Sequence, residues 1–316
     1  MQQLSILLGL TGSEQSKYAA EVAWALAKRC EGRVHALHVV DTRSAWDMLR
    51  NEKPGYIGSG VYVLAYETLC NSHRNIGNAL SEKFTAVAEG QAVPTDVFML
   101  EGDPVKSVCD SARDNDLVII GHEPRNSAKK DQHRHIVRFA VAEALAHECV
   151  KPLIIVQGAL AGWSNMSVLV SADHLNFEFI AAAVRLARFL ELPVQLVVLT
   201  TGTHEQPADS MYKDIRAAHP ELKDIQIEIA ELSGVAVEKR ASIFQQEIEL
   251  DWKPDPDTLM VIPTRSSGGN RVTVFDTSPD LFVRHLSLPS IMMWPEEHVD
   301  LNLESKKSKK KSASLR

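Results

Sequence analysis

The feature that most constrains the fold is a repeated alternation of short, continuously apolar segments with longer segments of helical periodicity. In the first half, runs rich in Val, Ile and Leu predict five strands, at Leu4–Leu8, Val34–Val40, Thr95–Leu100, Leu117–Ile120 and Leu153–Val156. Apolar residues at helical spacing predict four intervening helices, at Ser16–Arg29, Val61–Glu89, Pro104–Asp114 and Arg138–His147. Strands that are apolar throughout are typical of a parallel sheet covered by helices on both faces, with right-handed crossovers. A doubly wound α/β domain is therefore expected.

The same order recurs in the second half, which indicates an internal duplication. Strands are expected at Val168–Val170, Val194–Leu199, Ile225–Ala230, Leu259–Ile262 and Ser290–Met293. Helices are expected at Phe177–Leu190, Asp209–His219, Val235–Glu249 and Pro279–Leu286. The aperiodic, glycine-containing segment Gln157–Met166 reads as a linker. We expect domain 1 at 1–158, domain 2 at 159–297 and a disordered Lys-rich tail at 298–316.

Charge and hydropathy exclude some classes of partner. The chain has a net charge of −7, and its last sixteen residues carry +5, so the rest carries −12. An acidic body argues against nucleic acid as a partner, because nucleic-acid binding requires a broad cationic surface. No apolar run reaches the roughly 18 residues of a membrane span, and the N-terminus lacks a signal-peptide pattern. A cytoplasmic protein is expected, with the polybasic tail a weak route to anionic lipid.

Catalytic and metal-binding patterns are missing from the sequence. The four cysteines, Cys30, Cys70, Cys109 and Cys149, show no C-x-x-C spacing, so buried free thiols are expected and no metal site. There is no Gly-x-Ser-x-Gly, no Walker lysine loop and no His-Glu-x-x-His. Asp103 before Pro104 has a structural explanation, as the N-cap of a helix with proline in its first turn.

Several short motifs together carry a resemblance to a known family. They are "HVVD" at 38–41, "EGDP" at 101–104, "DLVIIG" at 116–121 and "AVAEALAHECVKPLIIV" at 140–156. On these motifs the first half resembles the universal stress protein (UspA-like) superfamily, of the adenine nucleotide alpha hydrolase-like fold, and the second half resembles it more faintly. The resemblance implies a sheet of order 3-2-1-4-5 in each domain. It also implies that the fifth strands pair within this chain, which makes an intramolecular pseudo-dimer and protects two apolar edges.

Members of that family that bind ATP use an Asp after strand one, backbone near the end of strand two and a glycine-rich phosphate loop before the last helix. In the first half, Thr11 stands in the Asp position, Val39 lies near the end of strand two and Gly121 matches the first glycine. Pro124, which has no N–H, replaces the second glycine, and Phe139 stands where the backbone must be bare. A family-type triphosphate site is therefore not expected here.

The second half keeps the spacing of the motif but not its residues. Asp173 stands in the position of the family's Asp after strand one, on the adenine side of the site, and Leu199 lies near the end of strand two. Ser266 replaces the second glycine of the motif, and Asp276–Thr277 replaces the Gly-Ser pair. A carboxylate at Asp276 would repel a phosphate at ~4 Å by roughly 1 to 4 kcal/mol. ATP binding is not expected in this half either.

The long loop of the first half carries five cations that offer another way to hold an anion: Arg125, Lys129, Lys130, Arg134 and Arg138. Charge-assisted hydrogen bonds of about 1.5–3 kcal/mol each would let two or three of them capture a phosphorylated ligand. The alternatives are a solvated surface segment, which is the usual state of a charge run, or docking onto the other half or another subunit.

The function implied by the resemblance is a non-enzymatic stress-response or regulatory role. The chain would bind a partner protein, or itself, or a small anionic ligand, without a required cofactor. The alternative is an ATP- or AMP-binding universal stress protein with weak ATPase activity.

Overall fold

The computed structural model describes residues 3–43, 45, 60–123, 140–172, 174–200, 213, 216–217, 225–235, 247–250, 252–267, 270–286, 288–299 and 301. Several predictions lie outside these residues: the cationic loop with Arg125, Lys129, Lys130, Arg134 and Arg138, then Asp173, most of the helix expected at 209–219 and the tail after 301.

The first half forms the alternating elements that its sequence predicts. Its strands are β1 (Ser5–Gly9), β2 (Arg33–Asp41), β3 (Thr95–Gly102), β4 (Leu117–Gly121) and β5 (Leu153–Val156). Its helices are α1 (Glu14–Cys30), α3 (Gly60–Glu89), α4 (Pro104–Ala112) and α5 (Val141–Glu148). Asp103 is the N-cap of α4, as predicted, because its side chain accepts hydrogen bonds from the N–H groups of Val105 and Lys106.

The second half repeats this pattern with changes in its middle. Its strands are β6 (Asn165–Ser171), β7 (Val194–Thr200), β8 (Gln226–Val235), β9 (Glu247–Leu250), β10 (Thr258–Ser267), β11 (Asn270–Thr273) and β12 (Ser290–Pro295). Its helices are α6 (Phe177–Leu190) and α8 (Pro279–His285).

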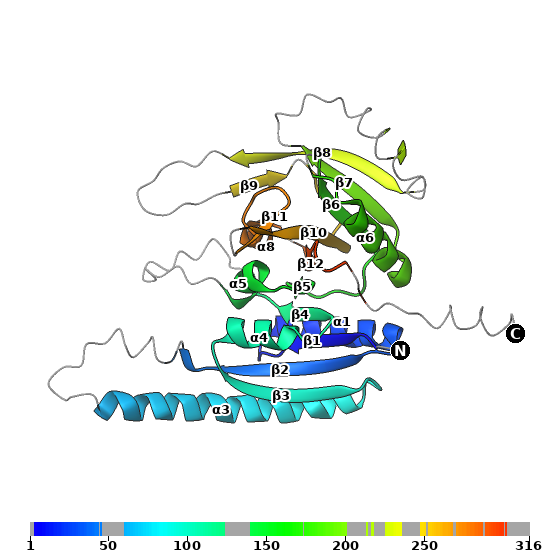
Figure 1. The fold of residues 1–316 in the computed structure, drawn as a ribbon. Helices are drawn as coiled ribbons and strands as arrows, with labels where there is room; N and C mark the ends of the chain where they lie inside the picture. Colours follow the sequence, from blue (N-terminus) through cyan, green and yellow to red (C-terminus); the bar gives the residue numbers. More distant parts are fainter. Residues whose placement is uncertain are drawn as a thin grey trace, which may run out of the picture.

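The two halves share one continuous sheet of order β3-β2-β1-β4-β5-β12-β10-β6-β7-β8-β9, with β11 paired to β10. Each half therefore has the predicted 3-2-1-4-5 order of parallel strands, and the fold class is confirmed. The halves join where β5 and β12 pair antiparallel, with Leu153 opposite Met293 and Val156 opposite Ser290. Figure 1 shows the first half below this junction and the second half above it.

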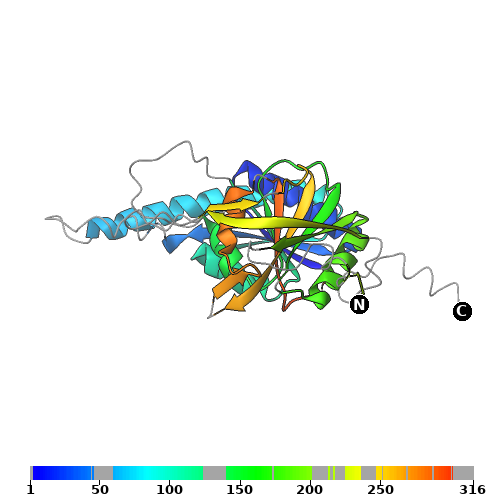
Figure 2. The same ribbon diagram turned by 90° about the horizontal axis from the view of Figure 1, so that it is seen from above.

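Helices cover both faces of the sheet, which gives three layers. One face packs against α1, α3 and α6, and the other against α4, α5 and α8. All four β5 side chains and all six of β12 are buried, so the junction lies inside the core. Seen from above in Figure 2, the long helix α3 (cyan) extends to the left past most of the sheet. Among the described residues, no helix is long and apolar enough to cross a membrane.

The helix predicted at 235–249 is wrong at both ends. Val235 ends strand β8, and Glu247–Leu250 forms β9, which pairs antiparallel with β8. The sequence Glu-Ile-Glu-Leu alternates polar and apolar residues, which is the period of a strand and competes with the helical pattern around it. The hairpin of β10 and β11, which pairs Thr264 with Thr273, was not predicted either.

The cysteines are free, as expected: Cys30, Cys70 and Cys149 are buried and Cys109 is half-buried.

Candidate functional site

The carboxyl ends of the parallel strands gather most of the described residues that the sequence singled out. Thr11 follows β1, Val39 lies near the end of β2 and Gly121 ends β4. In the second half Leu199 lies near the end of β7, and Ser266 lies near the end of β10. Thr277 precedes α8, beside Thr273 and the end of β10. Each set lies at the kind of edge where open parallel sheets bind ligands, and because β5 and β12 are antiparallel the two sets lie at opposite edges of the shared sheet.

Side chains of this chain cap the head of α1. The N-cap Ser13 accepts a hydrogen bond from the N–H of Ser16, and the hydroxyl of Ser16 accepts one from the N–H of Thr11 (2.9 Å). The hydroxyls of Thr11 and Ser13 lie 2.9 Å apart. Thr11 therefore belongs to a local cap, a role that a Thr or Ser side chain fills without any ligand.

Gly121 has a packing reason to be glycine. A Cβ atom at this position would lie 2.5 Å from the backbone of Gln15 and Ser16 in the first turn of α1. The bare backbone of Gly121 lets β4 and α1 approach closely, which is one of the uses of glycine that requires no ligand. The first-half match to the phosphate motif is thus explained by contact between two elements.

The head of α5, where the family binds phosphate, holds a carboxylate of this chain. Glu143 is fully buried, and its Oε2 atom accepts a hydrogen bond from the N–H of Ala140 (3.2 Å). The same oxygen lies 3.1 Å from the guanidinium of Arg284 on α8. Its other oxygen, Oε1, has no hydrogen-bond partner among the described residues. The carboxylate of Glu143 thus occupies the positive end of the helix dipole, where a phosphate would otherwise bind.

In the second half, a carboxylate from beyond β12 occupies a backbone donor at the position of the motif's second glycine. Glu297 accepts a hydrogen bond from the N–H of Ser266 (2.9 Å) and pairs with the buried Arg271 (3.2 Å). Burial would raise the pKa of Glu297, but these two partners hold it below its usual value. The backbone N–H that a phosphate would need is therefore already used.

Asp276, which stands in the place of a motif glycine, has a backbone conformation that favours glycine. Its φ angle is +56°, in the left-handed region, and its carboxylate pairs with Arg265. Asp tolerates this region better than most residues. The hydroxyls of Thr277 and Thr273 lie 2.7 Å apart, so Thr277 closes the turn after β11. This turn thus has a backbone conformation suited to glycine, but its side chains bond to other residues of the chain.

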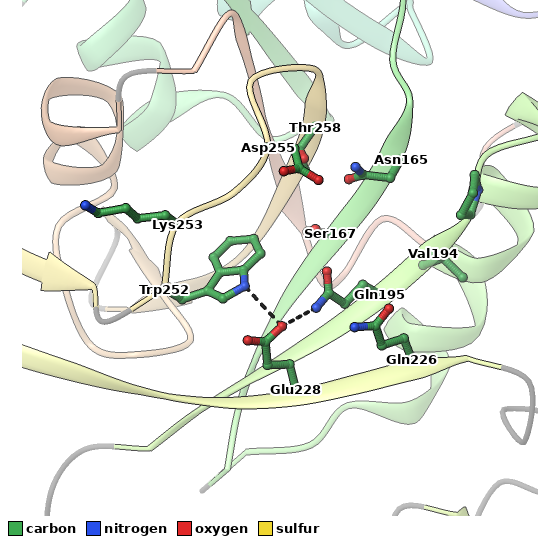
Figure 3. A pocket seen from close by; sticks show the side chains of 11 residues that line it. Asn165, Ser167, Val194, Gln195, Gln226, Glu228, Trp252, Lys253, Asp255 and Thr258 are labelled. Atoms are coloured by element: carbon green, nitrogen blue, oxygen red, sulfur yellow. Dashed lines mark hydrogen bonds between the residues drawn. The ribbon is translucent and has the colours of Figure 1, made fainter.

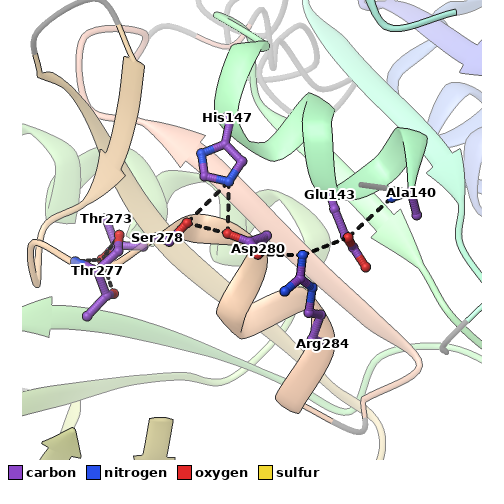
Figure 4. A network of polar contacts seen from close by, with 8 residues as sticks. All are labelled: Ala140, Glu143, His147, Thr273, Thr277, Ser278, Asp280 and Arg284. Atoms are coloured by element: carbon purple, nitrogen blue, oxygen red, sulfur yellow. Dashed lines mark hydrogen bonds and ion pairs between the residues drawn. The ribbon is translucent and has the colours of Figure 1, made fainter. Parts of the chain in front are cut away.

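A polar network joins the last helices of the two halves (Figure 4). On α8, the buried Asp280 lies 2.8 Å from Nε2 of His147 and 2.9 Å from Arg284. Ser278 donates a hydrogen bond to Asp280 and lies 3.2 Å from the same His147 nitrogen. Burial would raise the pKa of Asp280, but the hydrogen bonds from His147 and Ser278 and the charge of Arg284 lower it.

These residues include a Ser, a His and an Asp, but they lack the geometry of a catalytic triad. In a triad the serine and the acid contact different nitrogens of the imidazole, so that a proton passes from one side to the other. Here both oxygens contact Nε2, and Ser278 bonds directly to Asp280. The network links α5 to α8.

Sequence reasoning missed Glu143, Asp280 and Glu297. A weak local signal existed for Glu143, since a Glu three residues after a helix start is a capping pattern. Glu297 had none, because Ser266 lies far from it in sequence.

A model of the universal stress protein family matches residues 4–157. A search of curated proteins returned no significant match.

Three solved structures resemble almost the whole chain. One is a universal stress protein from Archaeoglobus fulgidus, with 14% identity, covering 94% of this chain and 100% of that one at a TM-score of 0.58. Another is a candidate universal stress protein from Pseudomonas aeruginosa, with 13% identity, 94% and 95% coverage and a TM-score of 0.53. A functionally unknown protein from the same species has 13% identity, 99% and 98% coverage and a TM-score of 0.52. At these identities they show a shared fold. Residues 4–157 of this chain thus belong to the universal stress protein family, and the second half continues the same fold.

Proposed function

We propose that this chain is a non-enzymatic regulatory module that acts by associating with protein, and that family-type ATP binding has been lost. The observation that carries the loss is that both phosphate positions hold carboxylates of the chain, Glu143 and Glu297. A bound triphosphate would have to displace them or lie against them, and like charges at ~4 Å repel by roughly 1 to 4 kcal/mol.

The surface that supports association is the outer edge of β3, which pairs with no other strand among the described residues. This strand ends the sheet and pairs with β2 on one side. Phe98, Met99 and Leu100 on β3 are 47%, 37% and 42% exposed. A groove of about 480 Å³ between α3 and β3 borders the same strand. Exposed apolar residues on an unpaired strand edge favour pairing with another strand.

The partner that fits this edge best is β3 of a second copy. Antiparallel pairing centred on Phe98 would set Phe98 opposite Phe98, and Val97 opposite Met99. The strand's two acids would lie opposite uncharged residues and are already paired within the chain. Asp96 lies 3.8 Å from His35, and Glu101 forms a two-point ion pair with Arg74. A two-fold contact of this kind is the commonest symmetry of soluble oligomers.

Sedimentation velocity over a range of protein concentrations tests the association. The wild type is expected to dimerise, and Phe98→Lys is expected to stay monomeric because a charged lysine protects strand edges. Val150→Lys is the matched control, since Val150 is an exposed apolar residue (39%) away from β3. A wild type that stays monomeric at every concentration, or a Val150→Lys variant as disruptive as Phe98→Lys, would contradict this assignment.

Calorimetric titration with ATP tests the proposed loss of ATP binding. We expect no heat of binding up to millimolar ATP in wild type. A micromolar dissociation constant, or ATP hydrolysis above the buffer rate, would favour the nucleotide-binding alternative. If ATP binding were lost in Lys129→Ala/Lys130→Ala, the cationic loop would be its site.

A further inference from the structure

A polar cavity lies in the second half, at the amino ends of the strands. Its volume is about 530 Å³, within the range of small-molecule sites. It opens at the starts of β6, β7, β8 and β10, across from the carboxyl ends discussed above. Figure 3 shows the side chains of Trp252, Glu228 and Gln195 converging there.

The sheet beneath this cavity is polar where a covered sheet is normally apolar. Ser167 on β6 pairs in register with Gln195 on β7, and Gln195 with Gln226 on β8. These three residues form one row across the strands. Two residues further along β6 and β7, the same face is apolar, with Leu169 and Val197 in the core. Parallel strands covered by helices are usually apolar throughout. This row of polar residues at the starts of β6, β7 and β8 is therefore unusual.

Ser167 is the clearest sign that the cavity is built for a ligand. The residue is 1% exposed and lines the cavity, yet its Oγ has no hydrogen-bond partner among the described residues. Ser5, on the first strand of the first half, offers a comparison because each serine precedes a core leucine by two residues. The hydroxyl of Ser5 donates to Asn115 (2.7 Å). A buried hydroxyl without a partner destabilises the protein, and a ligand that bonds to it removes that cost.

Two other groups at the cavity are already oriented. Glu228 accepts hydrogen bonds at Oε2 from the indole N–H of Trp252 (3.2 Å) and from the amide of Gln195. The bond to Glu228 holds the edge of the Trp252 indole, whose ring adds an apolar surface to a wall otherwise rich in amide and hydroxyl groups. The second carboxylate, Asp255, lies on the loop that also carries Lys253.

We propose that this cavity binds a small polyhydroxylated molecule, of monosaccharide or cyclitol size. Hydroxyl groups both donate and accept hydrogen bonds, and so do the amides and hydroxyls that line the cavity. The carbon face of a sugar ring is apolar and matches an indole ring. Lys253 offsets part of the charge of Glu228 and Asp255, so a neutral ligand fits better than an anion. The site is independent of association through β3.

Ligand-observed saturation-transfer NMR with D-glucose, D-galactose, D-mannose, D-ribose and myo-inositol tests the proposal on the full chain. At least one of these probes is expected to bind with a dissociation constant on the order of 1 mM or tighter. Ser167→Ala and Trp252→Ala are each expected to weaken that probe at least about tenfold. Ser167→Ala removes an unpartnered hydroxyl, so its urea midpoint should equal or exceed that of the wild type.

Ser5→Ala is the matched control. It removes a partnered hydroxyl in the other half, so it should lower stability and leave probe binding unchanged. The proposal is overturned if none of the five probes binds at millimolar concentration, or if Ser167→Ala binds as well as the wild type. Binding of spermidine in preference to every sugar would overturn it too, because the carboxylates would then define a site for cations.

Discussion

Asp280 is the residue whose replacement tests the link between the halves most sharply. Its carboxylate is 4% exposed and accepts hydrogen bonds from His147, Ser278 and Arg284. In Asp280→Asn the charge disappears, and an amide N–H₂ must face either the guanidinium of Arg284 or the other donors. Arg284 keeps its second partner, Glu143, so the variant loses part of the network.

The expected cost follows from the number of charged hydrogen bonds lost. Each is worth about 1.5–3 kcal/mol, so loss of one to two gives a decrease in the free energy of unfolding of about 1.5–6 kcal/mol at pH 7. Asp276→Asn is the matched control: its carboxylate is 76% exposed and pairs with Arg265, so a change within about 1 kcal/mol is expected.

The assay is urea unfolding of wild type and both variants across pH 7 to 2.5. The pKa of Asp280 is lowered in the folded state, so its stabilisation is complete above its unfolded pKa of about 3.9 and is lost as pH falls through the folded value. The gap between wild type and Asp280→Asn should therefore be constant near neutrality and shrink below about pH 4. A gap under about 0.5 kcal/mol at pH 7, or one that does not shrink in acid, would refute the reasoning.

Two further substitutions and one labelling experiment test other parts of the structure. Gly121→Ala would place a Cβ 2.5 Å from the backbone of Gln15, so a loss of about 1–3 kcal/mol is expected in urea unfolding, and a wild-type midpoint would contradict the close packing. Glu297→Gln removes the anion bound by Ser266, so stability should fall at pH 7 and converge on the wild type below about pH 4; a difference independent of pH would count against the ion pair. Burial raises the pKa of Cys30 to about 12, so Ellman's reagent should modify it after unfolding only; fast labelling of Cys30 itself in the native protein, located by peptide mapping, would disprove its burial.

The sequence was sufficient for most of the sheet. The strand Leu153–Val156 was predicted to the residue, because four apolar residues between a proline and a glutamine leave little choice once both faces are buried. The pairing of β5 with β12 followed from the family resemblance and an edge that needs protection.

The second half departs from the prediction where local signals conflict. The segment that ends in Glu247–Leu250 carries both a helical and an alternating pattern, and its antiparallel pairing with β8 decides for the strand. The secondary-structure propensity of the local sequence does not include such a contact with a strand elsewhere in the chain.

The sequence predicted which strand ends carry the candidate site residues, but it did not predict which side chains bond there. Parallel strands put Thr11 and Gly121 at one edge, and the alternation of strands and helices along the chain is enough to imply this. That Glu297 would bond to Ser266 depends on how the chain turns after β12. Such a contact between distant segments leaves no trace in spacing or composition.

The junction of the halves and the loss of the phosphate sites are two results of one arrangement. Pairing β5 with β12 brings α5 and α8 together, and the heads of these helices are the positions where the family binds phosphate. In this chain Glu143 and Asp280 lie in the first turns of the two helices, and both pair with Arg284. Charges that hold the halves together are therefore charges that would repel a phosphate. Restoring glycines to the loops would not restore ATP binding while these carboxylates remain, because they compete for the same helix ends.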